Sequence, residues 1–512
     1  MNDSKQRKTG AILSYVSIIV NTLIQLLYTP LLIRMLGQSE YGLYSLANSI
    51  IGYLTVLDLG FGNAIIVYTA KYRAKKDKES EQKLHGMFKI VFYVIGIIAV
   101  ILGLILYLNV NLFFKQTMTD VELNKARIMM LILTFNLGIT FSFSIYSSII
   151  SAYEKFTFQK IIAISSTIMK PLIMIPLLFL GMKSITMTLV ITFANVFVVT
   201  SNYLFCKKKL KVNIKFNGFD KALFKTILGY SIWIFIGVIV DKVNWSVDNF
   251  ILGSVSGTVA VSIYSLATTL NQLFINLSNA ASSVLLPKMS KMIAKNASPD
   301  KITKEFVKIG RLQHLIIFLM VSGFIIIGKE FFQIWAGEGY EDSYYTGLLL
   351  IIPVCVPLIQ NLGISIRQAM NKHRFSSIVR MCVAILNLII SIPLAKAYGA
   401  IGAAAGTCIG LTISTIIQNF YYHLAIKLDI IYFWKTIIKM SIPFIIPWVI
   451  TITFKNFIVL DGILSLILYG GIFTATYCFT AYFLSMNEYE KNIIKKPIIK
   501  ITKIIRRKKW LE

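Results

Sequence analysis

The sequence predicts an all-α polytopic membrane protein with fourteen transmembrane helices, arranged as two parallel six-helix lobes plus two extra C-terminal helices. Three observations predict this class: an apolar composition, positive charge in alternate connections, and an internal repeat. Of the 512 residues, 56% are hydrophobic and 15% are charged, and the mean hydropathy is +0.71. Because long apolar runs dominate the chain, a soluble globular protein is excluded.

The predicted helices follow from the apolar segments. The first one comes after a short basic tail, but it runs for about 25 residues without a small-residue cleavage site, so we interpret it as a retained helix. The fourteen segments lie near residues 11–35, 41–70, 87–109, 128–150, 158–181, 184–206, 224–251, 256–286, 308–328, 344–367, 375–397, 400–426, 434–454 and 461–485.

The formal charge of +29 is concentrated in alternate connections. The basic ones lie at 71–83, 206–221 and 287–311 and in the tail at 491–510, whereas GQSE and AGEGYED are short or acidic. By the positive-inside rule both termini are cytoplasmic. The charge is therefore a topology signal, with attraction to anionic lipids added, and it does not indicate nucleic-acid binding.

An internal repeat sets the domain organisation. YSLA at 44–47 recurs at 264–267, ILSY at 12–15 is matched by ILGY at 227–230, and IPL at 175–177 recurs at 392–394. The pattern favours a duplication, and six helices per copy place both copies in the same orientation. The predicted domains are an N-lobe at 1–206, a basic cytoplasmic linker at 207–223, a C-lobe at 224–427, helices thirteen and fourteen at 428–485, and a basic cytoplasmic tail at 486–512.

Polar residues form stripes on the helices that the repeat makes equivalent. They predict a water-filled cavity between the lobes, although hydrogen bonds between helices in a dry bundle would use the same residue types. The predicted cavity residues are Asn21 and Gln25 on helix one, Asp58 on helix two, Asp241, Lys242, Trp245 and Asp248 on helix seven, and Gln272 and Asn276 on helix eight.

Charged residues inside apolar segments are stronger evidence for a functional site than the polar stripes, because each charge is costly in a bilayer unless it is solvated or paired. Lys170, Lys242 and Arg367 are predicted point charges for an anionic substrate, and Lys170 directly precedes Pro171. Asp58 is a predicted partner of Lys242, as a gate or as a structural ion pair. An aspartate in the membrane can also bind H⁺ or Na⁺, so coupling of transport to either ion stays an open alternative.

The remaining motifs give weaker evidence about function. The cysteines have unrelated spacings, and we expect no metal and no cofactor apart from a coupling ion. GFIIIGKE at 323–330 lacks the Ser or Thr of a nucleotide-binding loop. Glycines at every fourth position, Gly402, Gly406 and Gly410, predict close packing within the bundle. The external loops are too short for an extracytoplasmic catalytic domain.

Two long stretches resemble a known family. PLLIRMLGQSEYGLYSLANSIIGYLTVLDLGFGNAI at 30–65 resembles the N-terminal signature of the bacterial polysaccharide-export flippases (Wzx type) of the multidrug/oligosaccharidyl-lipid/polysaccharide superfamily, and residues 331–407 are similar to its second lobe. The resemblance implies a V-shaped two-lobe protein, not an enzyme, in the bacterial cytoplasmic membrane. Such a protein moves an undecaprenyl-pyrophosphate-linked oligosaccharide from the cytoplasmic to the outer leaflet by alternating access.

The resemblance also sets the expected partners and the alternatives. A monomer is expected, working with a polysaccharide polymerase and export machinery, and without nucleic acid. The family's cavity is cationic, whereas Asp58, Asp241 and Asp248 dilute that character here. A peptidoglycan lipid-precursor flippase and a cation-coupled multidrug exporter of the same superfamily remain alternatives. A membrane polymerase or ligase would need a large external loop.

Overall fold

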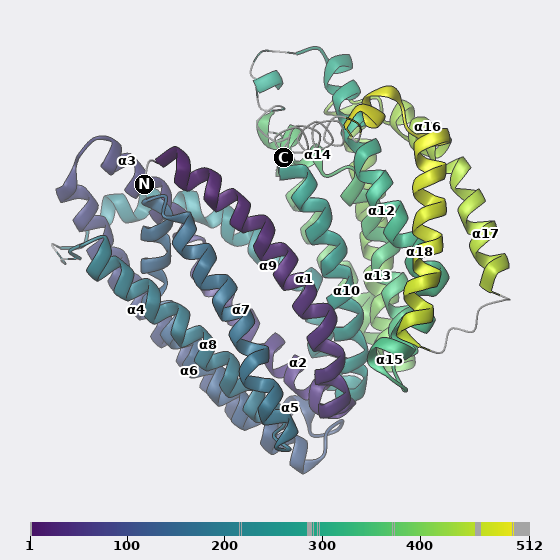
Figure 1. The fold of residues 1–512 in the computed structure, drawn as a ribbon. Coiled ribbons are helices and arrows are strands. Elements are labelled where there is room, and N and C mark those ends of the chain that lie inside the picture. Colours follow the sequence, from purple (N-terminus) through teal and green to yellow (C-terminus); the bar gives the residue numbers. More distant parts are fainter. Residues whose placement is uncertain are drawn as a thin grey trace, which may run out of the picture. The chain divides into compact units, whose positions relative to one another are not determined.

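The computed structural model describes residues 3–214, 216, 218–283, 289, 291–293, 295, 297–370, 372, 374–455, 462–493 and 495 (Figure 1). Every regular element of that part is helical, which confirms the predicted all-α class. Twelve of its segments are long and apolar enough to cross a membrane. The chain is therefore a multi-pass membrane protein, and the count of fourteen spans stays a prediction.

The elements follow one another with short connections. The first are α1 (Asp3–Leu36), α2 (Gln38–Tyr53), η1 (Leu54–Asp58), α3 (Phe61–Ala74), α4 (Lys78–Leu108), α5 (Val110–Phe114), α6 (Asp120–Ala152), α7 (Phe156–Phe179), α8 (Ser184–Leu204), η2 (Phe205–Lys209) and α9 (Lys221–Val255). They are followed by α10 (Gly257–Ser283), α12 (Pro299–Ala336), α13 (Asp342–Ile359), α14 (Leu362–Ala369), α15 (Arg374–Leu424), α16 (Ile430–Ser441), η3 (Ile442–Phe444), α17 (Ile445–Lys455), α18 (Ile463–Thr480) and η4 (Ala481–Ser485).

These elements form two compact units. Unit 1 comprises Met1–Thr269 and Ala384–Thr407, and unit 2 comprises Leu270–Val383 and Cys408–Glu512. Unit 1 therefore contains α1 to α9, the first part of α10 and the middle of α15. The predicted lobes, which are divided near 207–223, stay a prediction.

The second apolar segment is not one helix. We predicted a helix over 41–70, but α2 ends at Tyr53 and continues as the 3₁₀ turn η1, after which Leu59 adopts a left-handed conformation with φ 51°. The carboxylate of Asp58 accepts the backbone N–H groups of Gly60 and Gly62 at the start of α3. The break thus gives Asp58 a helix-capping role that apolarity alone does not predict.

The predicted segment 344–367 is also interrupted. α13 ends at Ile359, and α14 begins as a separate short helix at Leu362. Two prolines inside α13, Pro353 and Pro357, remove backbone donors near its end. Arg367 therefore lies on α14 and not on the spanning helix where the sequence placed it.

α15 folds back on itself at a glycine. Gly399 has φ 58°, a left-handed conformation that interrupts the helical dihedrals of α15. A Cβ added at Gly402 would lie 1.9 Å from the Leu394 carbonyl oxygen, and one at Gly406 would lie 2.2 Å from Ser391 Oγ. The predicted close packing is confirmed at these two glycines, because only a missing side chain permits this approach of the two arms.

Unit 2 has an aromatic core at its C-terminal helices. Phe444 and Tyr477 stack with ring centroids 4.3 Å apart, and Phe473, Tyr469 and Met440 are buried with them. The Tyr477 hydroxyl donates to the Leu315 carbonyl oxygen at 2.9 Å. This core fixes α16, η3 and α18 against α12.

Candidate functional site

The α2–α9 interface of unit 1 positions Lys242. Tyr53 Oη donates to the Ser246 carbonyl oxygen at 2.5 Å, and Asn249 Nδ2 donates to Ser49 Oγ at 2.8 Å. Gly52 lies on the same face of α2, and a Cβ added there would lie 3.9 Å from Lys242 Nζ. The lysine ammonium therefore lies beside α2 at Gly52.

Lys242 is half-buried and has no acidic partner among the residues that the structure describes. The predicted ion pair with Asp58 is not formed: the Asp58 carboxylate caps α3 instead. The side chains of Asp241 and Trp245 lie outside the described residues, so their predicted places in the site stay predictions.

Lys170 on α7 is a second cation in the apolar part of unit 1. It is half-buried, and no described carboxylate forms an ion pair with it. Pro171 and Pro176 interrupt the backbone hydrogen bonding of α7, so the carbonyl groups one turn before them lose their usual donors. The surroundings of Lys170 therefore combine a positive charge with backbone carbonyl groups that lack their usual helical donors.

α1 packs along α7 and carries the first predicted polar stripe. Asn21 is exposed, whereas Gln25 is half-buried and its buried Oε1 atom has no hydrogen-bond partner among the described residues. A buried amide oxygen without a donor is rare in proteins and is commonly satisfied by water or a ligand. Gln25 is thus suited to accept a hydrogen bond from a polar ligand.

Asp248 lies inside unit 1 and not on a solvent-facing stripe. Its side chain is 1% exposed. Tyr264 of α10 donates a short hydrogen bond to Asp248 Oδ2, and the Thr407 hydroxyl of α15 donates to the same atom at 2.9 Å. The other carboxylate oxygen, Oδ1, is buried without a partner in the described part of the chain.

Thr407 connects this carboxylate to further oxygen atoms of α15. Asn387 Oδ1 lies 3.4 Å from Thr407 Oγ1 and accepts a hydrogen bond from Ser391 Oγ at 2.8 Å, and Ser391 Oγ lies 3.3 Å from the Ala403 carbonyl oxygen. Sequence analysis missed Tyr264, Asn387, Ser391 and Thr407. The signal was available in part, because Asn387 and Ser391 are spaced by one helical turn within an otherwise apolar run.

The remaining predicted residues belong to unit 2. Gln272 and Asn276 are exposed neighbours on α10, and Gln272 Nε2 donates to Asn276 Oδ1 at 3.0 Å. Arg367 is 8% exposed and donates to Ser376 Oγ at 2.6 Å and to Gln418 Oε1. Its guanidinium also lies 5.1 Å from the centroid of the Tyr422 ring. These contacts engage its Nη1 group within the protein itself.

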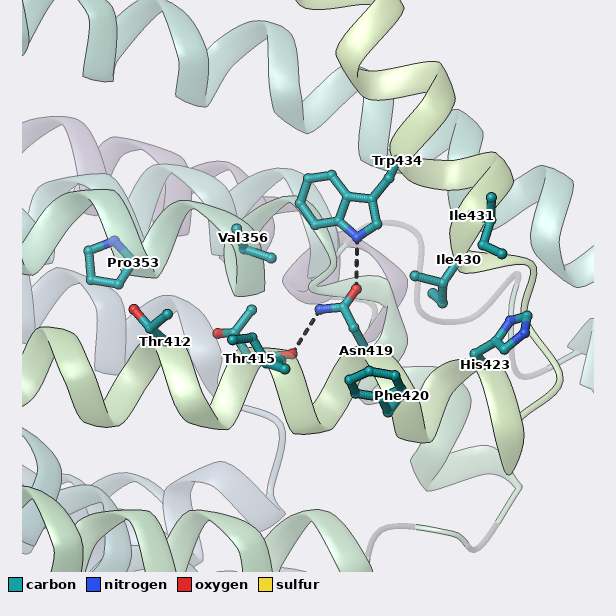
Figure 2. A pocket seen from close by; sticks show the side chains of 11 residues that line it. Pro353, Val356, Thr412, Thr415, Asn419, Phe420, His423, Ile430, Ile431 and Trp434 are labelled. Atoms are coloured by element: carbon teal, nitrogen blue, oxygen red, sulfur yellow. Dashed lines mark hydrogen bonds between the residues drawn. The ribbon is translucent and has the colours of Figure 1, made fainter.

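Unit 2 also contains an apolar pocket of about 530 Å³, which Figure 2 shows between α13, α15 and α16. Two of its polar side chains form hydrogen bonds within the protein: Trp434 Nε1 donates to Asn419 Oδ1 at 3.0 Å, and Asn419 Nδ2 donates to the Thr415 carbonyl oxygen at 2.8 Å. The pocket therefore suits hydrocarbon. It is lined by Pro353, Val356, Thr412, Thr415, Ile416, Asn419, Phe420, His423, Ile430, Ile431 and Trp434.

Residues 8–293 match the family of polysaccharide biosynthesis proteins. The chain belongs to this family. A protein assigned as an O-antigen transporter in Shigella flexneri is 22% identical over 415 residues, which cover 79% of this chain and 94% of that protein. The predicted resemblance to Wzx-type flippases of the multidrug/oligosaccharidyl-lipid/polysaccharide superfamily is thereby confirmed.

Solved structures show the same fold. The lipid II flippase MurJ in its inward closed conformation aligns with a TM-score of 0.71 at 16% identity, covering 96% of this chain and 99% of that one. An inward-facing multidrug resistance MATE family transporter of the MOP superfamily aligns with a TM-score of 0.59 at 15% identity, covering 82% and 99%. Family and fold together point to a membrane transporter, and the expectation that the chain is not an enzyme stays a prediction.

Proposed function

We propose that this protein is a flippase that moves an undecaprenyl-pyrophosphate-linked oligosaccharide repeat unit from the cytoplasmic to the outer leaflet by alternating access. It would serve cell-surface polysaccharide export in the bacterial cytoplasmic membrane, with both termini cytoplasmic. The observation that carries the proposal is the pair of half-buried lysines of unit 1, Lys170 and Lys242, without acidic partners among the described residues. In a family of polysaccharide biosynthesis proteins, such cations suit a pyrophosphate.

Each side chain has a role in this proposal. The ammonium groups of Lys170 and Lys242 neutralise the pyrophosphate, and Gln25, through its free amide oxygen, accepts a sugar hydroxyl. Asn21 adds an exposed amide on the same helix. No bond is made or broken, since the protein only lowers the barrier for moving a polar headgroup through hydrocarbon.

We further propose that ion coupling acts through Asp248. An ionised carboxylate without a cation is unfavourable in a buried site, so binding of H⁺ or Na⁺ would stabilise it. Asp248 Oδ1, Asn387 Oδ1 and Thr407 Oγ1 are the kind of hard oxygen atoms that an alkali cation prefers. Asp248→Asn should therefore remove the dependence of flipping on the H⁺ or Na⁺ gradient, and a retained dependence would place coupling elsewhere.

The function is tested by flipping in proteoliposomes. Purified protein is reconstituted with a fluorescent polyprenyl-pyrophosphate oligosaccharide, and a membrane-impermeant reagent reports the leaflet in which the label lies. Wild-type protein should expose the label, while Lys170→Glu and Lys242→Glu should each reduce the rate by tenfold or more, because each removes a charge-assisted contact and adds repulsion. Lys225→Glu, an equal charge change at an exposed position of α9, is the control.

Two alternatives are decided in the same assay. Fold similarity to the lipid II flippase favours testing a peptidoglycan lipid precursor beside the oligosaccharide lipid, and faster flipping of the precursor would reassign the substrate. Failure to flip any lipid under imposed H⁺ and Na⁺ gradients would favour the cation-coupled multidrug exporter.

A further inference from the structure

We propose that a cationic pocket of unit 2, formed by α12, α16 and the end of η4, binds the headgroup of an anionic phospholipid of the surrounding bilayer. The pocket has a volume of about 520 Å³. It is separate from the substrate residues proposed above, and the inference does not depend on the transported molecule. Its lining residues are Arg311, Tyr432, Lys435, Thr436, Lys439, Met440, Leu484, Ser485, Met486 and Asn487.

The back of the pocket is rigid. Arg311 Nε and Nη2 bind the two carboxylate oxygens of Glu490 at 2.6 and 2.8 Å, and Nη2 also donates to the Ser485 carbonyl oxygen at 2.9 Å. Ser485 Oγ in turn donates to the Met440 carbonyl oxygen at 3.1 Å. These bonds join α12, α16 and η4, so the pocket is preformed and its shape does not depend on a ligand.

The net charge of the pocket comes from Lys435 and Lys439. The buried Glu490 neutralises Arg311, whereas neither lysine has an acidic partner in the described ranges. The two lysines are four residues apart on one helix, where like charges repel. An anion bound between them would relieve this repulsion, and the Asn487 amide, which lines the same pocket, could donate a hydrogen bond to a phosphate oxygen.

The position of the lysines identifies the anion as part of a lipid. They lie in the span Ile430–Lys455, about 8 and 14 Å along the helix from its first residue at 1.5 Å per residue. Lys435 belongs to a stripe with Ile431, Ile438 and Ile442, whose exposed fractions are 70%, 60% and 59%. A ligand that fills the pocket with its anionic head therefore finds an apolar surface for its chains beside it.

The sequence extends the positive charge beyond the pocket. After Asn487, residues 491–510 contain nine lysines and arginines. Basic pockets at helix ends and adjoining basic segments recognise anionic lipid headgroups in membrane proteins. Because the apolar stripe of α16 is exposed in unit 2 itself, a bilayer phospholipid reaches the pocket directly, which favours it over a free phosphate.

Native mass spectrometry of the full chain in detergent tests the proposal. Phosphatidylglycerol and phosphatidylcholine of equal chain length are titrated against wild type and against Lys435→Gln/Lys439→Gln. We expect wild type to prefer phosphatidylglycerol and the double variant to bind it about tenfold to thirtyfold more weakly. Lys435→Arg/Lys439→Arg should keep the preference, which separates lost charge from misfolding.

Lys208→Gln/Lys209→Gln is the matched control, because it removes two exposed lysines from the end of another span. The proposal is overturned if the double variant binds phosphatidylglycerol as wild type does, or if the control lowers binding equally. It is also overturned if inorganic phosphate at millimolar concentration displaces the lipid completely, since the pocket would then recognise the free anion. Flipping activity enters none of these readouts, so failure of the proposed function leaves the result unaffected.

Discussion

At the scale of single residues, the contacts of Asp248 show how a carboxylate is accommodated inside a membrane protein. Two hydroxyl groups donate to one of its oxygens, while the other oxygen has no partner among the described residues. Hydrogen bonds to a charged group are worth about 1.5–3 kcal/mol each, so these donors offset only part of the cost of burial. In the proposed coupling, this free oxygen is where a cation or a proton would bind.

Tyr264→Phe should therefore destabilise unit 1. The change removes the donor to Asp248 and leaves the ring in place, so the free energy of unfolding should fall by about 1.5–3 kcal/mol. Chemical unfolding in detergent micelles measures the change, with Tyr398→Phe, at a tyrosine that is 70% exposed, as the control. An unchanged midpoint for Tyr264→Phe would show that the hydrogen bond contributes nothing to folding.

Arg367→Met should leave flipping close to the wild-type rate. Arg367 is buried and bound to Ser376 and Gln418, and these two residues also bond each other at 2.8 Å, so their shared hydrogen bond survives the substitution. Replacing a buried ionic group by an apolar one of similar volume is often neutral for stability. Flipping and unfolding are measured on the same preparation. A folded Arg367→Met protein that does not flip lipid would restore Arg367 as a substrate contact.

The sequence predicted which residues are chemically unusual better than it predicted their contacts. Lys170, Lys242 and Asp248 were found because charge in an apolar run is rare. The predicted pairing of Asp58 with Lys242 was wrong, because Asp58 caps α3, and this capping depends on a break in the helix that hydropathy does not reveal. Tyr264 and Thr407 were missed because their relation to Asp248 depends on how three helices pack.

At the scale of elements, α2 and α10 approach closely at a single glycine within unit 1. A Cβ added at Gly42 would lie 1.8 Å from the Thr258 carbonyl oxygen. Beside this contact, Thr258 Oγ1 donates to Glu122 Oε1 at 2.8 Å. Gly37 and Gly257, which precede α2 and begin α10, have φ of 82° and 84°, and YSLA follows each at the same distance. The repeated tetrapeptide thus occupies equivalent turns of two helices that touch.

Gly42→Val should separate these helices and lower stability. No flexible side chain can yield, since the obstructing atom is a backbone oxygen, and overpacking of this kind typically costs about 1–3 kcal/mol. Thermal unfolding measures the effect. The control is Gly229→Val on α9, where an added Cβ meets nothing within 4 Å. Equal unfolding temperatures for the two variants would refute the close contact.

The predicted boundaries of the helices were correct where a turn residue marks the end of an apolar segment. They were wrong where the helix breaks inside an apolar run. The fold-back at Gly399 falls between two predicted segments, because glycine and a gap in hydropathy coincide there. By contrast, Leu59 adopts a left-handed conformation within an apolar run, and α13 ends before Gln360 although apolar residues continue after it. At the end of α13 the effect of Pro353 and Pro357 combines with a tertiary contact, the 2.8 Å hydrogen bond from Gln360 Nε2 to Asn419 Oδ1.

At the scale of the whole molecule, the charge distribution predicts the orientation in the membrane. Cysteines introduced at Lys76 and Lys183 should react oppositely with a membrane-impermeant maleimide: Lys76→Cys only in lysed cells, and Lys183→Cys in intact cells as well. The background must lack the native cysteines, because Cys382 and Cys478 are exposed. Labelling of Lys76→Cys in intact cells would invert the proposed topology.

The fold class was predictable because hydropathy and charge act over the whole chain and average out local errors. The helical architecture and the family agree with the sequence-based expectation. The sugar, the coupling ion and the partner proteins depend on a few side chains each, and a pattern of apolar segments holds no information about them. Lys435 and Lys439 of the cationic pocket of unit 2 illustrate this limit. Only the fold shows that they line a pocket together with Arg311 and Ser485.

The two hydrogen bonds to Asp248 also have a consequence for biosynthesis. Tyr264 follows Asp248 in the chain by 16 residues, whereas Thr407 follows it by 159. At about 5–20 residues per second, the ribosome needs roughly 8 to 32 seconds to synthesise the intervening chain. During that interval α9 holds an acidic group in or near the bilayer without its second donor. The nascent N-terminal half is therefore expected to stay close to the insertion machinery until the turn at Gly399 has been made.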